Sequence, residues 1–325
     1  MRAAVVRQWG APESITVEER ADPEPGPGEV VVRVESAAVN YPDVLIAANQ
    51  YQVSIPTPFT PGSEWAGVVE RTGPGVTAPG VGDRVSGGGI VGAFAQKLVA
   101  PDTVTRIPDG VSFDAAAAFS VVYGTAYSVL RSVAEVQPGE WVAVLGAAGG
   151  VGLATVDLAV LLGARVLAAA SSPDKLAVCR ERGAEAVVDY DREPLKERMK
   201  EITGGGADVV VDPVGGPYAE EALRATRFGS RFVTVGYPAG IPRIPLNLVL
   251  LKGVRVLGYE ARTFGVNAPE LLARDRDELQ QLYESARVAP HIGATFDLDD
   301  VAVALRLMGD RGAIGKIIIH PWSAD

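Results

Sequence analysis

The sequence is poor in the two residue types that most often bind transition metals. Its 325 residues contain one cysteine, Cys179, and two histidines, His291 and His320, both late in the chain. A single cysteine excludes an internal disulfide and every zinc site that needs two or more thiolates. A lone histidine is more often a structural residue than a ligand, so we expect no metal site.

An excess of basic charge is also missing. The formal net charge of −10 disfavours a nonspecific nucleic-acid binder and a protein that docks on anionic membranes. The opening stretch MRAAVVRQWGAPES lacks the apolar core of a signal peptide. The uncharged stretch from Trp141 to Val156 is too short for a membrane helix. We therefore expect a cytoplasmic protein with neither a nucleic-acid nor a membrane partner.

The first third of the chain predicts an irregular β-rich domain. Short β patterns at 3–7, 14–19 and 29–39 are separated by turn signals such as PEPGPGE. Pro42 suits the first turn of a short helix. The pattern predicts a β-barrel-like domain with no internal repeat.

The pattern changes near residue 112. An alanine-rich stretch, 113–136, has helical spacing, and apolar strands then alternate with helices, which predicts a doubly wound parallel sheet. From Pro269 two helices and the strand IGKIIIHP break this alternation, and we expect this tail to return to the first domain. The predicted strands of the sheet are WVAVLG, ARVLAAA, AEAVVDY, ADVVVD, RFVTVGY and VRVLGYE.

The stretch VLGAAGGVG lies between a predicted strand and a predicted helix, as a dinucleotide-binding turn does. Ala147, Gly149 and Gly152 occupy the three small-residue positions of that fingerprint, with alanine in place of the first glycine. Gly149 would let the backbone approach a pyrophosphate, and the N–H groups from Gly150 and Val151 onward would bind it. Gly152 would let the helix pack on the strand. Close packing alone is the alternative explanation of these glycines.

The end of the next strand bears on which dinucleotide binds. An acidic residue is expected there when the ribose 2′-OH is free, but the chain has Ala170. Asp174 stands just inside the following helix, where it complements the helix dipole. Ser171, Ser172 and Lys175 could bind a 2′-phosphate, which favours NADPH. A helix cap with a surface lysine is the alternative.

Several separate segments point to a known family. AAVNYPDVLIAANQYQ, TPFTPGSEWAGVVE, YGTAY, AAGGVGLATVDLAVLLGARVLAAASS and GAIGKIIIH occur in this order and span nearly the whole chain. With them the chain resembles the zinc-independent quinone oxidoreductases of the medium-chain dehydrogenase/reductase superfamily. The resemblance implies an α/β protein with a GroES-like β-barrel-type catalytic domain and a Rossmann cofactor domain. The predicted boundaries are 1–120 and 266–325 for the catalytic domain and 121–265 for the cofactor domain.

The resemblance also bears on the metal. Zinc-dependent relatives have cysteine, histidine and cysteine at the positions of Asn40, Ser63 and Ala117, and none of these three is a usual zinc ligand. Without that Lewis acid we expect poor alcohol dehydrogenase activity.

Further site residues are implied by the resemblance alone. Asn40 would lie beside the nicotinamide ribose and Thr125 at the nicotinamide end. Tyr190 would pack near the 2′-phosphate, and Gly236 follows a strand whose end faces the cofactor. Tyr51 would face the substrate and donate a proton, with a half-buried loop aromatic as its alternative role. Asp43, beside a helix start, is expected to cap it.

The resemblance implies hydride transfer from NADPH to a quinone or an α,β-unsaturated carbonyl, and it also implies a homodimer. Two alternatives stay open. One is an NADPH-dependent enoyl thioester reductase, and the other is a non-catalytic NADPH-binding sensor.

Overall fold

The computed structural model describes residues 1–322 and divides into two compact units. The first unit combines residues 1–120 with the chain from Pro290 onward, and the second is Val121–Ala289. The second boundary differs from the predicted one, because residues 266–289 belong to the second unit. The helix α10 (Pro269–Glu284) is held there by side chains: Ser132 donates to Asp275 and Tyr127 to Glu278. Those partners are about 150 residues away in the chain, beyond the reach of a local pattern.

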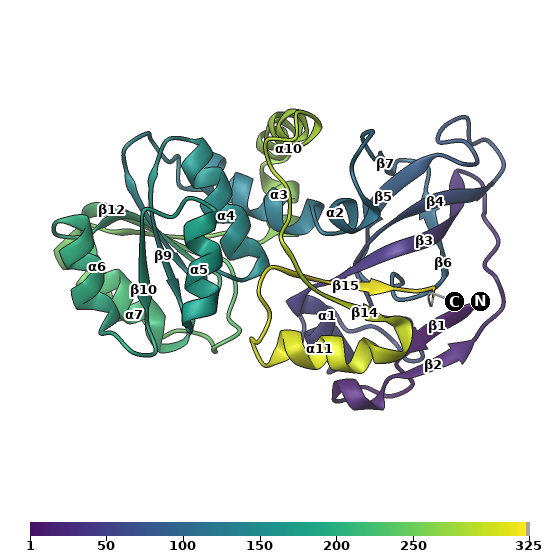
Figure 1. Ribbon diagram of the computed structural model, residues 1–325, viewed down its shortest axis with the longest axis horizontal. Coiled ribbons are helices and arrows are strands. Elements are labelled where there is room, and N and C mark those ends of the chain that lie inside the picture. Colours follow the sequence, from purple (N-terminus) through teal and green to yellow (C-terminus); the bar gives the residue numbers. More distant parts are fainter. Residues whose placement is uncertain (323–325) are drawn as a thin grey trace. The chain divides into compact units, whose positions relative to one another are not determined.

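The second unit is built on a six-stranded, all-parallel sheet in the order β10-β9-β8-β11-β12-β13 (Figure 1). All five residues of the central strand β8 are buried, as expected for a parallel strand covered on both faces. The order reverses direction beside β8, which makes the carboxyl end of that strand the topological switch point. The strands are β8 (Trp141–Leu145), β9 (Arg165–Ala170), β10 (Ala186–Asp189), β11 (Ala207–Asp212), β12 (Thr226–Thr234) and β13 (Arg255–Gly258).

Helices connect these strands and cover the sheet. They are α3 (Ser120–Ser128), the π-helix Val129–Val133, α4 (Gly150–Leu161), α5 (Pro173–Glu181), α6 (Leu195–Thr203), α7 (Gly216–Arg224), α8 (Leu246–Lys252), α9 (Ala261–Asn267) and α10. Ser120, the first residue of α3, still belongs to the first unit.

The first unit is organised around a mostly antiparallel seven-stranded sheet with β3 at its centre. The path runs β14-β15-β3-β4-β5-β7, and β6 also pairs with β3. Ile318 of β15 pairs with Ala38 of β3, so the tail of the chain joins the sheet of the first domain, as expected (Figure 1). The strands are β1 (Arg2–Val5), β2 (Thr16–Glu19), β3 (Glu29–Val39), β4 (Glu64–Thr72), β5 (Arg84–Gly88), β6 (Lys97–Pro101), β7 (Thr105–Arg106), β14 (Ile292–Asp297) and β15 (Lys316–His320).

The α-helices described in this unit are α1 (Tyr41–Ala47), α2 (Phe113–Ala117) and α11 (Val301–Gly309). Short 3-10 helices occupy Pro12–Ser14 and Leu298–Asp300. The predicted helical stretch 113–136 is therefore not one helix, because α2, α3 and the π-helix divide it. The helices α8 and α9 and the strand β14 lie in segments for which the pattern predicted no such element.

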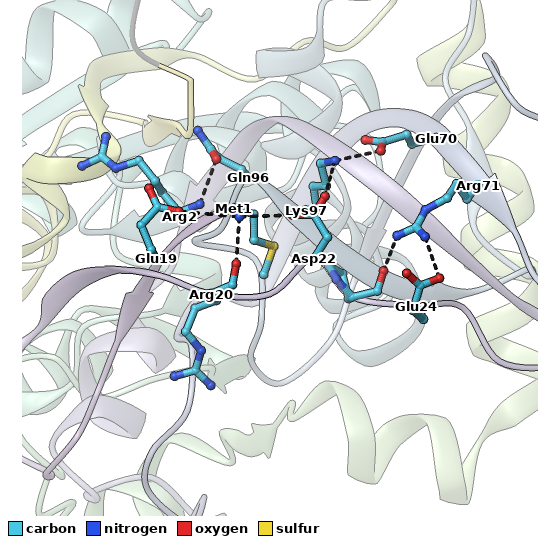
Figure 2. Close-up of polar contacts among 11 residues, drawn as sticks. Met1, Arg2, Glu19, Arg20, Asp22, Glu24, Glu70, Arg71, Gln96 and Lys97 are labelled. Atoms are coloured by element: carbon cyan, nitrogen blue, oxygen red, sulfur yellow. Dashed lines mark hydrogen bonds and ion pairs between the residues drawn. The ribbon is translucent and has the colours of Figure 1, made fainter.

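A polar network ties the proline-rich segment before β3 to the sheet. Lys97 Nζ lies 2.7 Å from Asp22 Oδ2 and 2.8 Å from Glu70 Oε1, and Arg71 Nη1 lies 2.6 Å from Glu24 Oε2 (Figure 2). Several charges that form a network stabilise more than an isolated surface pair does. It fixes a segment that lacks regular structure of its own.

Candidate functional site

The glycine run forms a tight turn at the switch point of the parallel sheet. Gly146 adopts a left-handed φ of +54°, and α4 begins after Gly149. The Ala147 N–H donates to the Ala169 carbonyl over 3.0 Å, which holds the turn against the end of β9. The first N–H groups of any helix, here those of Gly150 and Val151 among them, lack an intrahelical acceptor and point out of its end. Among residues 1–322 no side chain caps α4 to satisfy them.

Gly152 and Gly149 of this turn differ in how much room their surroundings leave for a side chain. A Cβ at Gly152 would lie 2.3 Å from the Gly146 carbonyl oxygen, so the contact between helix and turn itself requires glycine. A Cβ at Gly149 would meet only the Gly146 oxygen, at 3.4 Å, and the φ of Gly149 is an ordinary −78°. Packing within the protein therefore does not require a glycine at position 149. The space that a side chain would fill lies beside the amino end of α4, and a helix N-terminus attracts anions.

The residues predicted to bind a 2′-phosphate come together at the end of β9. Lys175 Nζ donates to Ser171 Oγ over 3.2 Å, after the buried Ala170. Ser172 caps α5 by accepting the Lys175 N–H, so its oxygen is already engaged as an acceptor while its hydroxyl can still donate. Asp174 is exposed in the first turn of α5, as expected for a residue that complements the helix dipole. The cluster presents a cation and two hydroxyls without a carboxylate at the strand end.

Tyr190 lies next to this cluster. Its N–H donates to the Ala170 carbonyl over 3.2 Å, since β10 pairs with β9 in parallel. Its ring packs on Tyr218 from α7, with ring centroids 4.3 Å apart, and Tyr218 OH donates to Asp191 over 3.0 Å. Sequence reasoning missed Tyr218, because 27 residues separate it from Asp191 and no local pattern relates it to Tyr190.

Thr125 and Gly236 are the remaining residues of the second unit that were predicted to bind the cofactor. Thr125 is half-buried on α3. Gly236 follows β12, and a Cβ there would have room, with the Pro213 carbonyl oxygen nearest at 3.7 Å. No hydrogen bond within residues 1–322 joins either residue to the glycine turn or to Lys175.

In the first unit, Asn40 is the centre of a buried polar cluster. It precedes α1, and its backbone N–H donates to Asp43 Oδ2 over 2.7 Å, so Asp43 caps the helix as expected. Its side-chain oxygen accepts from Lys316 Nζ over 2.6 Å. Its side-chain nitrogen lies 3.2 Å from Glu64 Oε2 and 3.4 Å from Ser63 Oγ.

This cluster changes the acidity of Asp43. Burial raises the pKa of its carboxyl from 3.8 to about 7, and the negative charge of Glu64 acts in the same direction. The Asn40 N–H, the Ser63 hydroxyl and the Lys316 ammonium oppose this shift. A proton therefore stays on Asp43 up to near-neutral pH, which reduces the net negative charge of the cluster.

Sequence reasoning missed Glu64 and Lys316. Both are almost fully buried, at 1% and 2% exposure, and Lys316 Nζ lies 3.1 Å from Glu64 Oε2. A signal was present: Lys316 opens the apolar run KIIIH, and a buried charge requires a partner. The partner could not be named, since 252 residues separate the two.

The donor set of the described residues does not fit a zinc site. Asn40 and Ser63 lie within 3.4 Å of each other, but they offer an amide and a hydroxyl, and Ala117 is a buried alanine. Within residues 1–322 no group of three or more His, Cys, Asp and Glu side chains could hold a metal ion. In the same part of the chain, no helix combines the length and the apolar character that a membrane span requires.

Tyr51 follows α1 in a loop. It is half-buried and packs against the hydrophobic core of the first unit. The role of Tyr51 as a proton donor stays a prediction, with a loop aromatic as its alternative.

The order of the parallel sheet, with a glycine turn at its switch point, defines a Rossmann dinucleotide-binding domain. Residues 150–273 match the sequence model described as zinc-binding dehydrogenase, and residues 26–109 match that of the alcohol dehydrogenase GroES-like domain. The quinone oxidoreductase-like protein 2 homolog of Nematostella vectensis is 37% identical over an alignment of 326 positions, which covers 98% of this chain and 88% of that protein.

Solved quinone oxidoreductases have the same fold. The enzyme from Thermus thermophilus is 33% identical with a TM-score of 0.85, over 98% of this chain and 100% of that one. The enzyme from Escherichia coli is 28% identical with a TM-score of 0.89, over 99% and 100%. Both are described in complex with NADPH. The chain belongs to the quinone oxidoreductase family of the medium-chain dehydrogenase/reductase superfamily and is an oxidoreductase of that family.

Proposed function

We propose that this protein transfers a hydride from NADPH to a quinone or to an α,β-unsaturated carbonyl. The observation that carries the proposal is the cluster after β9, where Ser171 and Lys175 follow Ala170 and no acidic residue stands at the strand end. A carboxylate there would repel a 2′-phosphate, whereas a lysine ammonium and a hydroxyl bind one through charge-assisted hydrogen bonds. The NADPH complexes of the two related enzymes support the same cofactor.

The chain's own residues would bind and orient this cofactor. The amino end of α4 and the open space at Gly149 accommodate the pyrophosphate, with Ala147, Gly150, Val151 and Gly152 forming the rest of the turn. Ser171, Ser172, Lys175 and Tyr190 receive the 2′-phosphate end, while Asn40, Thr125 and Gly236 contact the nicotinamide end. When bound, NADPH supplies the hydride, and the protein supplies orientation and a site that excludes water.

Tyr51 is the proposed proton donor to the reduced substrate. Negative charge develops on the substrate oxygen during hydride transfer, so a neutral hydrogen-bond donor stabilises the transition state. A tyrosine hydroxyl, with an ordinary pKa near 10, stays protonated at neutral pH and can serve. A quinone needs this donor less, because its reduced product is only weakly basic and water can protonate it.

The test is steady-state oxidation of NADPH, with NADH in parallel, against 1,4-benzoquinone, 9,10-phenanthrenequinone, a simple enone and crotonyl-CoA. NADPH-selective turnover of the quinones or the enone supports the proposal. Preference for the thioester favours the enoyl thioester reductase instead. Tight NADPH binding without turnover of any of the four favours a sensor and removes the catalytic role of Tyr51.

We also propose that the protein forms a homodimer through the outer edge of the cofactor-domain sheet. Within residues 1–322 β13 pairs only with β12, so its other edge offers free backbone hydrogen-bonding groups. Nearby elements expose large apolar side chains, which a partner would cover. Two copies of this edge, related by a two-fold axis, can pair with each other because the same surface is used on both subunits. The exposed side chains are Phe228 of β12, Leu246, Leu250 and Leu251 of α8, and Val256 of β13.

A further inference from the structure

The Asn40 side-chain amide is held at both ends by opposite charges. The Lys316 ammonium donates to its oxygen over 2.6 Å, and its nitrogen faces the Glu64 carboxylate at 3.2 Å. Lys316 Nζ also lies 3.1 Å from the same Glu64 oxygen, so the three side chains close a triangle. The other Glu64 oxygen accepts from Ser120 Oγ over 2.8 Å.

Stability alone does not account for this pair of buried charges. Burying an ammonium and a carboxylate at 2% and 1% exposure costs desolvation free energy that their attraction often fails to offset. Replacing such a pair with apolar residues of similar volume is often neutral or stabilising. The pair is therefore best explained by what it does to the group between its members.

We propose that the Lys316–Glu64 pair is a positioning device that fixes the orientation of the Asn40 amide, and through it the nicotinamide ribose of the bound cofactor. The inference rests on the proposed function, since that function gives Asn40 its contact with the ribose.

The chemistry of the three groups permits only one orientation. An amide turned by 180° exchanges its donor and its acceptor at nearly the same positions. An ammonium can only donate and a carboxylate can only accept, so the turned amide of Asn40 would oppose both neighbours. A single fixed orientation lets Asn40 meet a ribose hydroxyl without first reorganising, which is how positioning groups accelerate a reaction.

The first experiment observes the amide directly. The sequence has four asparagines, so labelling with ¹⁵N-asparagine gives four side-chain amide signals, and the one lost in Asn40→Ala identifies Asn40. The double variant Lys316→Met/Glu64→Gln removes both charges of the pair together, so neither member is left as an unpaired buried ion. We expect its Asn40 signal to move towards those of exposed amides and to exchange faster with solvent. An unchanged signal overturns the inference.

A matched control comes from the same unit. Lys97 and Glu70 form another lysine–glutamate pair, 2.8 Å apart, away from Asn40 and its partners. Lys97→Met/Glu70→Gln should leave the Asn40 signal unchanged. A comparable movement of the signal in this control would assign the effect to general loosening of the unit and overturn the inference.

The second experiment measures kcat and KM for NADPH. We expect Lys316→Met/Glu64→Gln to lower kcat/KM by about 10- to 100-fold while the unfolding midpoint stays near that of the wild type. Adding Asn40→Ala to it should cost nothing further, because the pair acts through Asn40. If adding Asn40→Ala lowers kcat/KM further, by the factor that it costs in the wild type, the inference is overturned. Full activity of the double variant also overturns it. A wild-type protein that binds no NADPH overturns the proposed function and the ribose contact with it, whereas the amide signal decides the positioning of Asn40 by itself.

Discussion

At the level of single residues, Gly152 and Gly149 separate a folding requirement from the binding requirement that we propose for this turn. Gly152 has no space for a Cβ, since the Gly146 carbonyl oxygen lies 2.3 Å from where that atom would be. Gly149 has such space within the protein itself. The same residue type in one turn therefore predicts different consequences of substitution.

Gly149→Val should abolish NADPH binding and leave the fold intact. The valine side chain would occupy the space next to the amino end of α4, where the pyrophosphate is proposed to bind, and the φ of −78° suits a non-glycine residue. We expect the dissociation constant, measured by NADPH fluorescence, to rise by at least about tenfold, which corresponds to about 1.4 kcal/mol. Retained affinity would rule out this turn as the phosphate site.

The control is Gly152→Ala, which should lower the stability instead. Its methyl group overpacks the contact between α4 and the turn, and overpacking of this kind costs about 1–3 kcal/mol. Thermal unfolding followed by circular dichroism should show a clear decrease of the midpoint for Gly152→Ala and little change for Gly149→Val.

Lys175→Ala should weaken NADPH more than NADH. The Lys175 ammonium lies beside Ser171. If it binds the 2′-phosphate as proposed, it loses this charged partner when the cofactor is NADH. A hydrogen bond between charged groups contributes about 1.5–3 kcal/mol, so the affinity for NADPH should fall by about tenfold or more. Titration of both cofactors into the variant measures this difference. Lys196→Ala, at a half-exposed lysine paired with Glu197 on α6, is the control, and equal weakening of both cofactors by Lys175→Ala would contradict the assignment.

Tyr51→Phe should lower the turnover of enones more than that of quinones. The variant keeps the ring that packs on the core of the first unit and removes only the hydroxyl. General acid catalysis contributes about 100-fold or more, so kcat for a simple enone should fall by that order while quinone turnover changes less. Equal, unaffected rates would leave Tyr51 as a loop aromatic.

At the level of secondary-structure elements, the side chain that caps the start of α1, Asp43, also titrates. Asp43 accepts the backbone N–H of Asn40, and burial raises the pKa of its carboxyl to about 7. An unfolded aspartate releases its proton near pH 4. Between these two values the folded state binds more protons than the unfolded state, so this group makes the free energy of unfolding fall as the pH rises from about 4 to 7.

Asp43→Asn should remove this dependence. An asparagine oxygen can still accept the Asn40 N–H but does not titrate. Denaturant unfolding at pH 5, 6, 7 and 8 should show that the wild type loses stability relative to the variant by at most about 1.4 kcal/mol per pH unit, and that the loss levels off above pH 7. Other titrating groups cancel in this comparison, since both proteins contain them. Parallel profiles for the two proteins would mean that Asp43 is ionised throughout.

For the molecule as a whole, the exposed apolar side chains around β13 predict the oligomeric state. A dimer should have twice the chain mass of 33.9 kDa in light scattering at micromolar concentration. Leu250→Asp places a charge on an 81% exposed leucine of α8 and should yield a monomer with an unchanged unfolding midpoint in dilute solution. Val303→Asp, on an exposed valine of α11 in the first unit, is the control and should remain dimeric. A wild type that runs as a monomer would contradict the proposal.

The features that could be predicted without the structure are those that contiguous residues encode. The alternation of apolar strands with helices predicted the parallel sheet, and the glycine run marked the turn that lies at its switch point. The absence of an acid at Ala170 can be seen in the sequence alone, whereas the family resemblance was needed to recognise Asn40, Ser63 and Ala117 as positions that lack the usual zinc ligands. The conformation of a turn and the apolar pattern of a strand are encoded by residues that are adjacent in the chain. A local pattern was therefore sufficient to predict these features.

The meeting of distant side chains, by contrast, depends on the folded chain. Folding places Lys316 against Asn40 across 276 residues of chain, packs Tyr218 on Tyr190, and puts α10 in the second unit rather than in the returning tail. Sequence spacing carries no information about such pairs, because their elements come together through packing of the whole unit. A charge in an apolar run shows in the sequence that it needs a partner, but only the packed fold supplies the particular residue that meets it.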